Sequence, residues 1–260
     1  MSSAHITALY RYPVKGFSPE PLSCADIAAG GTIPYDRAYA IENGPSGFDA
    51  DAPSYRPKIR FLMLMRNERM AGYQTSFDEA SGVLRIFTDG ALQAEGALGT
   101  EEGRRAIEVW LAKTFRGELR GPPKILAARS HSFSDKAAKV VHLVNLASVR
   151  ELEARLGRPV DPLRFRPNIV IDGAPAFSEL DWQRVDLPKL KLAFESRTGR
   201  CAATNVDPAT GRRDMDMPRA LEKLYGHADF GIYLRAKTAG SIAVGDHIEP
   251  SASAQANLPL

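Results

Sequence analysis

Short segments rich in β-branched and aromatic residues run along most of the chain, and Gly, Pro, Asp and Asn separate them. This arrangement is typical of strands joined by turns. The predicted strands cover residues 6–12, 37–42, 61–66, 83–88, 140–144, 168–171, 189–195 and 231–237. Because regular crossover helices do not separate these strands, we expect a mostly antiparallel barrel or sandwich rather than a doubly wound sheet.

Three segments have the apolar spacing or the end signals of helices. The first begins after Thr100, a good N-cap residue, and reaches about residue 115. Its apolar face consists of Ala106, Ile107, Trp110 and Leu111. The second covers residues 147–156 and ends at Gly157, and the third follows Pro218 through Leu224. The sequence therefore predicts a mainly β protein with a few helices, an α+β fold.

A linker candidate lies at residues 117–124, where Pro122-Pro123 interrupts the strand and helix patterns. A break there divides the chain into an N-terminal domain of residues 1–118 and a C-terminal domain of residues 119–250. Residues 251–260 are small and polar, which predicts a disordered tail.

Composition narrows the class of protein. The chain is 44% hydrophobic and 25% charged, as ordinary globular proteins are. Its formal net charge of +3 is too small to indicate a nucleic-acid surface, and the basic residues form no block. No basic leader is present, and no apolar run approaches the ~20 residues of a membrane span. We expect a cytoplasmic protein that binds neither nucleic acid nor a membrane.

The two cysteines, Cys24 and Cys201, are too few for a disulfide framework or an iron–sulfur cluster. Cys201 lies beside Arg200 and close to Arg197, which would favour the thiolate, the form that binds metals and attacks electrophiles. A lone cysteine is more often an inert packing residue. We expect that inert role for Cys24.

A second informative segment is Arg164-Phe165-Arg166-Pro167-Asn168, in which two arginines precede a predicted strand. Strand alternation would put Arg164 and Arg166 on one side, where both could hold an anion by forked hydrogen bonds. A surface ion-pair network is an equally good explanation from these residues alone. Lys15, in Tyr12-Pro13-Val14-Lys15, has the same ambiguity, because a lysine at a turn is usually solvated.

His227 lies in the glycine-bounded segment Tyr225-Gly226-His227. A histidine titrates near neutral pH and could donate a proton, although such a residue is more often structural. The segment His131-Ser132-Phe133-Ser134-Asp135 carries a weaker signal, and it could cover part of a site.

The order of these clusters resembles one family. They are Tyr12-Pro13-Val14-Lys15, Tyr35-Asp36-Arg37, Arg164-Phe165-Arg166-Pro167-Asn168, Gly199-Arg200-Cys201, Val206-Asp207-Pro208, Tyr225-Gly226-His227 and Val244-Gly245-Asp246. Over residues 5–249 the chain resembles MOSC-domain proteins with an N-terminal MOSC β-barrel domain. That family includes the mitochondrial amidoxime-reducing component and the C-terminal domain of molybdenum cofactor sulfurase. The resemblance implies a MOSC β-barrel domain, preceded by a smaller β-rich domain, with molybdenum cofactor (Mo-molybdopterin) held between them.

The resemblance also implies residue roles. Cys201 matches the metal-ligating cysteine, and a soft thiolate suits molybdenum. The expected cofactor-binding residues are Lys15, Arg37, Arg164, Arg166, Asn168, Arg200 and Thr204. His227 and Asp207 are the candidate proton donors, which completes the expected catalytic set with Cys201. Two features depart from the family: Gly199 stands where a hydroxyl residue is common, and residues 43–58 lack the Arg-Gln pattern of the reductase branch.

The implied activity is that of a molybdenum-dependent oxidoreductase that removes oxygen from small N-hydroxylated compounds, such as amidoximes or hydroxylaminopurines. Its electrons would come from a separate electron-donor protein. The resemblance further implies pyridoxal phosphate binding as a family-level property. Two alternatives stay open: a molybdenum cofactor carrier or sulfur-transfer protein with a persulfide on Cys201, and a MOSC-like fold that has lost its cofactor.

Overall fold

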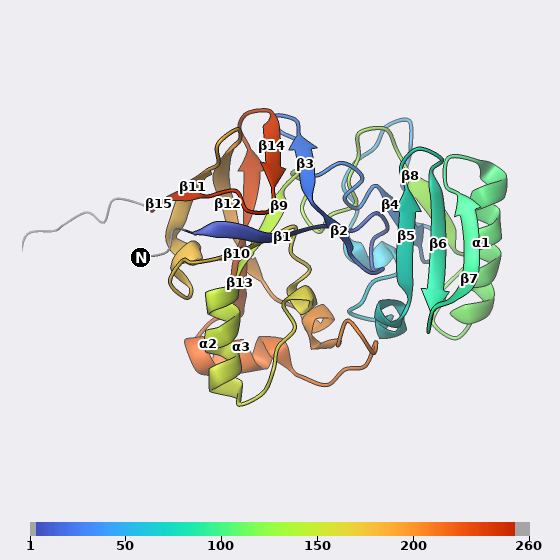
Figure 1. Ribbon diagram of the computed structural model, residues 1–260. Coiled ribbons are helices and arrows are strands. Elements are labelled where there is room, and N and C mark those ends of the chain that lie inside the picture. Colours follow the sequence, from blue (N-terminus) through green and yellow to red (C-terminus); the bar gives the residue numbers. More distant parts are fainter. Residues whose placement is uncertain (1–3, 253–260) are drawn as a thin grey trace, which may run out of the picture.

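The computed structural model describes residues 4–252 and has two lobes (Figure 1). The larger one, the sheet lobe, contains an eight-stranded sheet. In spatial order its strands are β15 (Glu249–Ala252), β11 (Trp182–Asp186), β12 (Lys191–Gly199), β13 (Asp229–Ala236), β9 (Val141–Asn145), β10 (Ile169–Asp172), β1 (His5–Arg11) and β2 (Glu20–Leu22). All neighbours in this sheet are antiparallel except β10 and β9, so the expectation of a mostly antiparallel sheet is confirmed.

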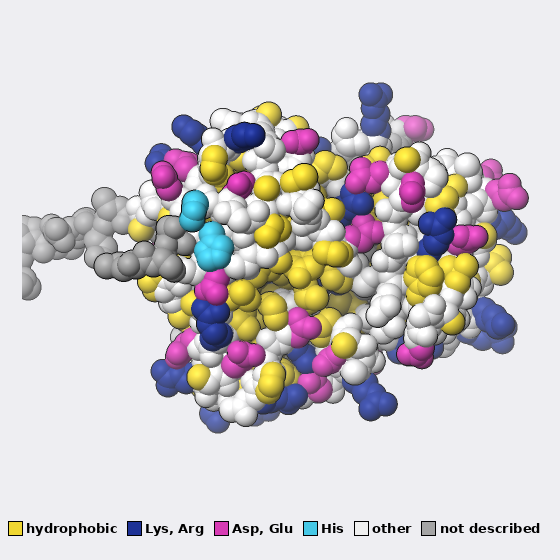
Figure 2. All heavy atoms as spheres, in the orientation of Figure 1, with side chains coloured by type: hydrophobic (Ala, Val, Ile, Leu, Met, Phe, Trp, Pro, Cys, Tyr) yellow, Lys and Arg dark blue, Asp and Glu magenta, His cyan; other side chains and the backbone are white. Residues whose placement is uncertain are grey.

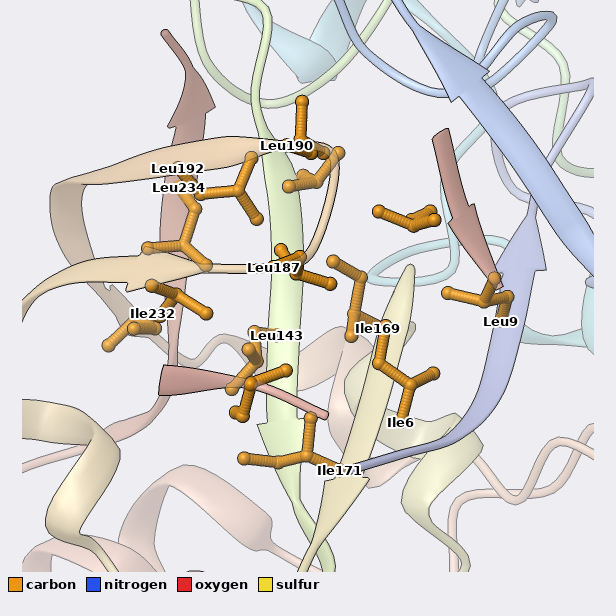
Figure 3. Close-up of a cluster of buried hydrophobic side chains, with 14 of the residues drawn as sticks. Ile6, Leu9, Leu143, Ile169, Ile171, Leu187, Leu190, Leu192, Ile232 and Leu234 are labelled. Carbon is orange, nitrogen blue, oxygen red and sulfur yellow. The ribbon is translucent and has the colours of Figure 1, made fainter. Parts of the chain in front are cut away.

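The core of the sheet lobe lies on one face of this sheet. Figure 3 shows side chains from β1, β9, β10, β12 and β13 in contact there, among them Ile6, Leu143 and Ile169. The pair β3 (Cys24–Ile27) and β14 (Gly240–Ala243) contributes Ile27 and Ile242 to the same core. Burial of large apolar side chains is the main stabilising term for such a lobe.

Two helices complete the sheet lobe, α2 (Leu146–Leu156) and α3 (Met217–Tyr225), and both were predicted. Gly157 ends α2 in the left-handed conformation at φ 66°, which glycine adopts without strain. The two helices share a separate apolar cluster with Phe165 and Phe230, whose rings stack at 4.0 Å.

The second lobe, residues 39–127, contains a three-stranded sheet of β5 (Gln74–Asp78), β6 (Val83–Thr88) and β7 (Ala91–Ala97) and a pair of β4 (Tyr39–Glu42) and β8 (Lys124–Ala127). Helix α1 (Glu101–Thr114) packs on β7. The Thr100 side chain accepts a hydrogen bond from Gly103 N at 3.0 Å, so the predicted N-cap is confirmed. Figure 2 shows hydrophobic side chains gathered between the two lobes.

Five short 3-10 helices connect these elements: η1 (Lys58–Arg60), η2 (Glu68–Gly72), η3 (Pro162–Phe165), η4 (Ser178–Asp181) and η5 (Ala202–Asn205). The strand predicted at residues 61–66 was wrong. Only Phe61 forms a strand-like bridge, to Glu42, and the chain then turns because Asn67 Oδ1 accepts from Met63 N at 3.1 Å. Its apolar residues are buried without forming a ladder.

The fold class predicted from the sequence, mainly β with a few helices, is confirmed. The lobes do not follow the chain in simple succession, because β1 belongs to the sheet lobe and β8 pairs with β4. Of the predicted disordered tail, Ser251 and Ala252 form part of β15, and residues 253–260 lie outside the described residues. None of the helices within residues 4–252 has the length and apolar character needed to cross a bilayer.

Candidate functional site

A cavity of about 310 Å³ lies between the two lobes. Eight residues predicted to form the site are on its wall: Lys15, Arg37, Arg164, Arg166, Asn168, Arg200, Cys201 and Thr204. The second lobe contributes Lys58 and the apolar residues Met63, Leu64 and Met65. Asp207 and His227 are not on the wall. The residues that line the cavity therefore lie up to 218 positions apart in the sequence, from Lys15 to Tyr233.

Cys201 follows the end of β12 and precedes η5. Its carbonyl oxygen accepts from Thr204 N at 3.0 Å and from Thr204 Oγ1 at 2.9 Å, which fixes the turn that carries the thiol. Lys58 Nζ lies 3.4 Å from Cys201 Sγ and 3.4 Å from Asp135 Oδ2. A cation from the opposite lobe thus contacts the sulfur atom.

Lys15 is buried and donates to Phe133 O at 2.9 Å and to Asp135. Burial lowers the pKa of Lys15, and Asp135 offsets only part of that effect. For Asp135, burial alone would raise the pKa, but Lys15 and Lys58 more than offset it and the pKa lies below its usual range. The Asp135 carboxylate therefore forms ion pairs with two ammonium groups, those of Lys15 and Lys58.

The Tyr12 ring is fully buried and lies between two guanidinium groups. Its centroid is 4.5 Å from Arg37 Cζ and 4.1 Å from Arg166 Cζ, both cation–π distances. Arg37 pairs with Asp36 at 2.5 Å. Arg166 forms no ion pair among the described residues, and its buried Nη2 has no hydrogen-bond partner. Burial lowers the pKa of Arg166 to about 10.

The strand alternation expected for Arg164 and Arg166 was wrong. Arg164 belongs to η3, and Arg166 adopts the left-handed conformation at φ 53°. This turn, rather than a pleat, brings both residues to the cavity. Asn168 fixes the start of the next strand, because its side chain accepts from His142 N at 3.1 Å and donates to Tyr10 O at 3.1 Å.

Arg200 and His142 form a buried pair on the cavity wall, with Arg200 Nη2 2.5 Å from His142 Nε2. A guanidinium can only donate, so Nε2 is the acceptor and the ring proton lies on Nδ1, 3.3 Å from Arg166 O. Burial, aided by the Arg200 charge, holds the pKa of His142 well below its usual value. His142 is therefore neutral and orients Arg200, whose pKa burial lowers to about 10.

The remaining predicted residues have other partners. Asp207 forms an ion pair with Arg164 at 3.2 Å. His227 Nδ1 accepts from Asp229 N at 3.2 Å. Arg197, which lines the cavity, pairs with Asp181 at 2.9 Å and donates to Leu180 O. The proton-donor roles of Asp207 and His227 stay predictions.

The residues present fit an anionic, sulfur-rich metal cofactor. Cations on the cavity wall outnumber the carboxylates Asp36 and Asp135, and the buried donors Arg166 Nη2 and Arg164 Nε have no hydrogen-bond partner within residues 4–252. Arginine forks suit phosphate oxygens. Within residues 4–252 no three His, Cys, Asp or Glu side chains cluster closely enough to hold a metal ion. A metal at Cys201 would therefore need further ligands from a cofactor, as a molybdenum dithiolene supplies.

Sequence reasoning missed two residues of this site, Lys58 and His142, and indicated a third, Asp135, only weakly. Lys58 comes from the second lobe, and nothing in its segment signals contact with Cys201. His142 lies in the predicted strand 140–144, and nothing in that segment signals a site residue. Asp135 belongs to the segment His131-Ser132-Phe133-Ser134-Asp135, whose polar residues and aromatic ring were the only available signal.

Comparisons with known proteins agree with the sequence patterns. The family model for the MOSC domain matches residues 128–249, and that for the MOSC N-terminal beta barrel domain matches residues 3–118. Mitochondrial amidoxime reducing component 2 of Rattus norvegicus is 33% identical over 120 residues, 42% of this chain and 36% of the relative. Mitochondrial amidoxime-reducing component 1 of Xenopus laevis is 31% identical over 180 residues, 58% of this chain and 52% of the relative.

The aligned part of the chain thus spans between about a third and a half of these relatives' own length. The solved structure of the YUAD protein from Bacillus subtilis superimposes with a TM-score of 0.43 at 14% identity, covering 96% of this chain and 97% of that chain. That likeness is too weak to bear on fold or function.

Proposed function

The chain belongs to the family that joins a MOSC N-terminal beta barrel domain to a MOSC domain, and from this premise we propose that it is a molybdenum-cofactor-dependent reductase of N-hydroxylated compounds. One observation carries the proposal: the Cys201 thiol lines a cavity whose wall is rich in cations, and the buried Nη2 of one of them, Arg166, has no hydrogen-bond partner among the described residues. The relatives are amidoxime-reducing components by name, which supports the reaction class.

Five wall residues have roles in this proposal. Cys201 is the protein ligand of the metal, and its backbone turn holds the sulfur in place. Arg166 and Lys15 bind the cofactor phosphate and pterin. Arg37, held by its ion pair with Asp36, adds a further positive charge. Arg200, oriented by neutral His142, offsets the negative charge of the bound cofactor.

When bound, molybdenum cofactor supplies the two-electron chemistry that removes an oxygen atom from nitrogen. The balanced reaction converts an N-hydroxyl compound, two electrons and two protons into the amine-level product and water. A separate electron-donor protein supplies the electrons. The apolar wall of Met63, Leu64 and Met65 limits water on the second-lobe side and leaves room for the organic part of a small substrate.

The test uses protein purified from a host that makes molybdenum cofactor. Reduced methyl viologen replaces the electron donor, and conversion of benzamidoxime to benzamidine is followed by chromatography. We expect turnover by the wild type and by Cys24→Ser, whose thiol is exposed and distant in sequence from the cavity residues, and loss in Cys201→Ser. No turnover by cofactor-loaded wild type would overturn the reductase proposal. A labile sulfur on Cys201, detected by mass spectrometry, would then favour sulfur transfer.

A further inference from the structure

The loop that follows Cys201 is anchored to a buried arginine. Arg164, with 2% of its side chain exposed, lies 2.7 Å from Asp214 Oδ1 through Nη1 and 2.8 Å from Asp214 Oδ2 through Nη2. The same Nη2 lies 3.2 Å from Asp207 Oδ2, and Nη1 donates to Asn205 O at 3.4 Å. Both terminal nitrogens of Arg164 are therefore occupied by residues 205–214, which we call the cysteine loop.

The carboxylates also organise the cysteine loop itself. Asp207 Oδ1 accepts from Ala209 N at 2.8 Å and from Thr210 N at 2.9 Å. Val206 and Arg213 form an antiparallel bridge, so the two ends of the loop meet beside Arg164. Arg164 thus contacts the base of a closed loop, four residues after Cys201 at its nearest point.

A second arginine ties the cysteine loop to the opposite lobe. Arg213 Nη2 donates to Leu64 O at 3.1 Å and Met65 O at 2.8 Å, and Arg213 Nη1 donates to Ala202 O at 2.8 Å, next to Cys201. Leu64 and Met65 are themselves cavity residues. The segment that carries the thiol is held from both sides of the cavity.

We propose that Arg164 is a positioning residue: it fixes the cysteine loop through Asp207 and Asp214 and thereby sets the place and accessibility of the Cys201 thiol. This inference deepens the proposed function and rests on Cys201 being its metal ligand. Arg164 is the buried partner of these ion pairs, and the loss of its carboxylate partners would leave its charge uncompensated in the interior. The bidentate contact to Asp214 also fixes orientation, which a single ammonium group could not do.

The experiment measures the thiol of the cofactor-free chain, so it does not depend on enzyme activity. In a Cys24→Ser background Cys201 is the sole cysteine. Its rate of alkylation by iodoacetamide is measured for that protein and after adding Arg164→Gln or Asp207→Asn. We expect both variants to react about tenfold faster, because either change releases the loop. Arg158→Ala is the matched control: Arg158 pairs with Asp214 at 2.9 Å but is exposed, and its rate should stay within about twofold.

The pair of variants separates positioning from a charge effect on the thiol. Arg164→Gln removes a positive charge and Asp207→Asn a negative one, so a through-space effect would shift the two rates in opposite directions. Arg164→Lys, which keeps the charge without the bidentate contact, should be intermediate. Hydrogen exchange should rise in residues 202–214 and not across the sheet lobe. If Arg164→Gln fails to fold, Asp207→Asn and its exchange profile decide the question.

Unchanged alkylation in Arg164→Gln and Asp207→Asn, with molybdenum retention lost only in Arg164→Gln, would overturn the inference and show that Arg164 binds the cofactor directly. Opposite shifts of the two rates would overturn it as well. Either result leaves the reductase proposal standing, and a failed turnover assay leaves this thiol measurement valid.

Discussion

At the scale of single residues, Glu179 differs from the buried charges of the cavity because no cation faces it. It is fully buried, and among the described residues it takes part in no ion pair. Ser148 Oγ donates to Oε1 at 2.8 Å, and Asn145 Nδ2 donates to Oε2 at 3.1 Å. Burial raises the pKa of Glu179, and these hydrogen bonds offset only part of that effect.

This raised pKa predicts a pH dependence of stability. The folded state binds the Glu179 proton more tightly than the unfolded state, so the free energy of unfolding falls as pH rises from the unfolded pKa through the folded one. Each unit of pKa difference corresponds to about 1.4 kcal/mol. Urea denaturation at a series of pH values from about 4.5 to about 8 measures the free energy of unfolding. It should show this fall in the wild type and not in Glu179→Gln. Glu151→Gln, at a half-exposed position, is the control and should keep the wild-type pH profile. A wild-type pH profile in Glu179→Gln as well would contradict the prediction.

At the scale of elements, the ends of helices were the most predictable features. Thr100 and Gly157 are local signals, because the hydrogen bond or the left-handed φ that ends a helix involves only residues nearby in sequence. The turn around Arg166 was not predictable in this way, because a left-handed arginine is stabilised by Tyr12, far away in the sequence. Residues 61–66 likewise have strand composition, but the pairing stops after the bridge from Phe61 to Glu42, where the chain turns toward Asn67.

From the contact of α1 with β7 we predict an effect on stability opposite to the one that helix propensity alone would give. Replacing Gly103 by Ala would favour the helix by about 1 kcal/mol in isolation. In the structure, however, a Cβ atom at Gly103 would lie 2.2 Å from Ala97 O and 2.4 Å from Ala97 N, both backbone atoms that cannot move freely. Overpacking should dominate, and we expect Gly103→Ala to lower the free energy of unfolding by about 2 kcal/mol.

Denaturant titration of the purified variant measures this difference. Gly117→Ala is the control, because a Cβ at Gly117 has no atom within 4 Å and its φ is not positive. Its stability should change by less than about 0.5 kcal/mol. A stabilised Gly103→Ala would mean that α1 does not pack on β7 as closely as described.

At the scale of the whole molecule, the site exists because two lobes meet. The sequence indicated Cys201, Lys15, Arg37, Arg166 and Asn168 through their motifs, and the fold brings all five to one cavity. It did not indicate the contact of Lys58 with Cys201 and Asp135, since these residues lie on different lobes and segments. Nor did it show that Arg164 faces two aspartates. Such pairings depend on the packing of distant segments, which composition and spacing do not encode.

The binding of molybdenum cofactor at Cys201 is the central claim, and metal content tests it most directly. Molybdenum is measured by elemental analysis, and oxidised pterin by fluorescence, on wild type, Cys201→Ser and Cys24→Ser from a cofactor-competent host. We expect about one molybdenum per chain, with matching pterin, in wild type and Cys24→Ser, and loss of the metal in Cys201→Ser. Absence of metal and pterin from all three proteins, or equal retention in both cysteine variants, would contradict the account.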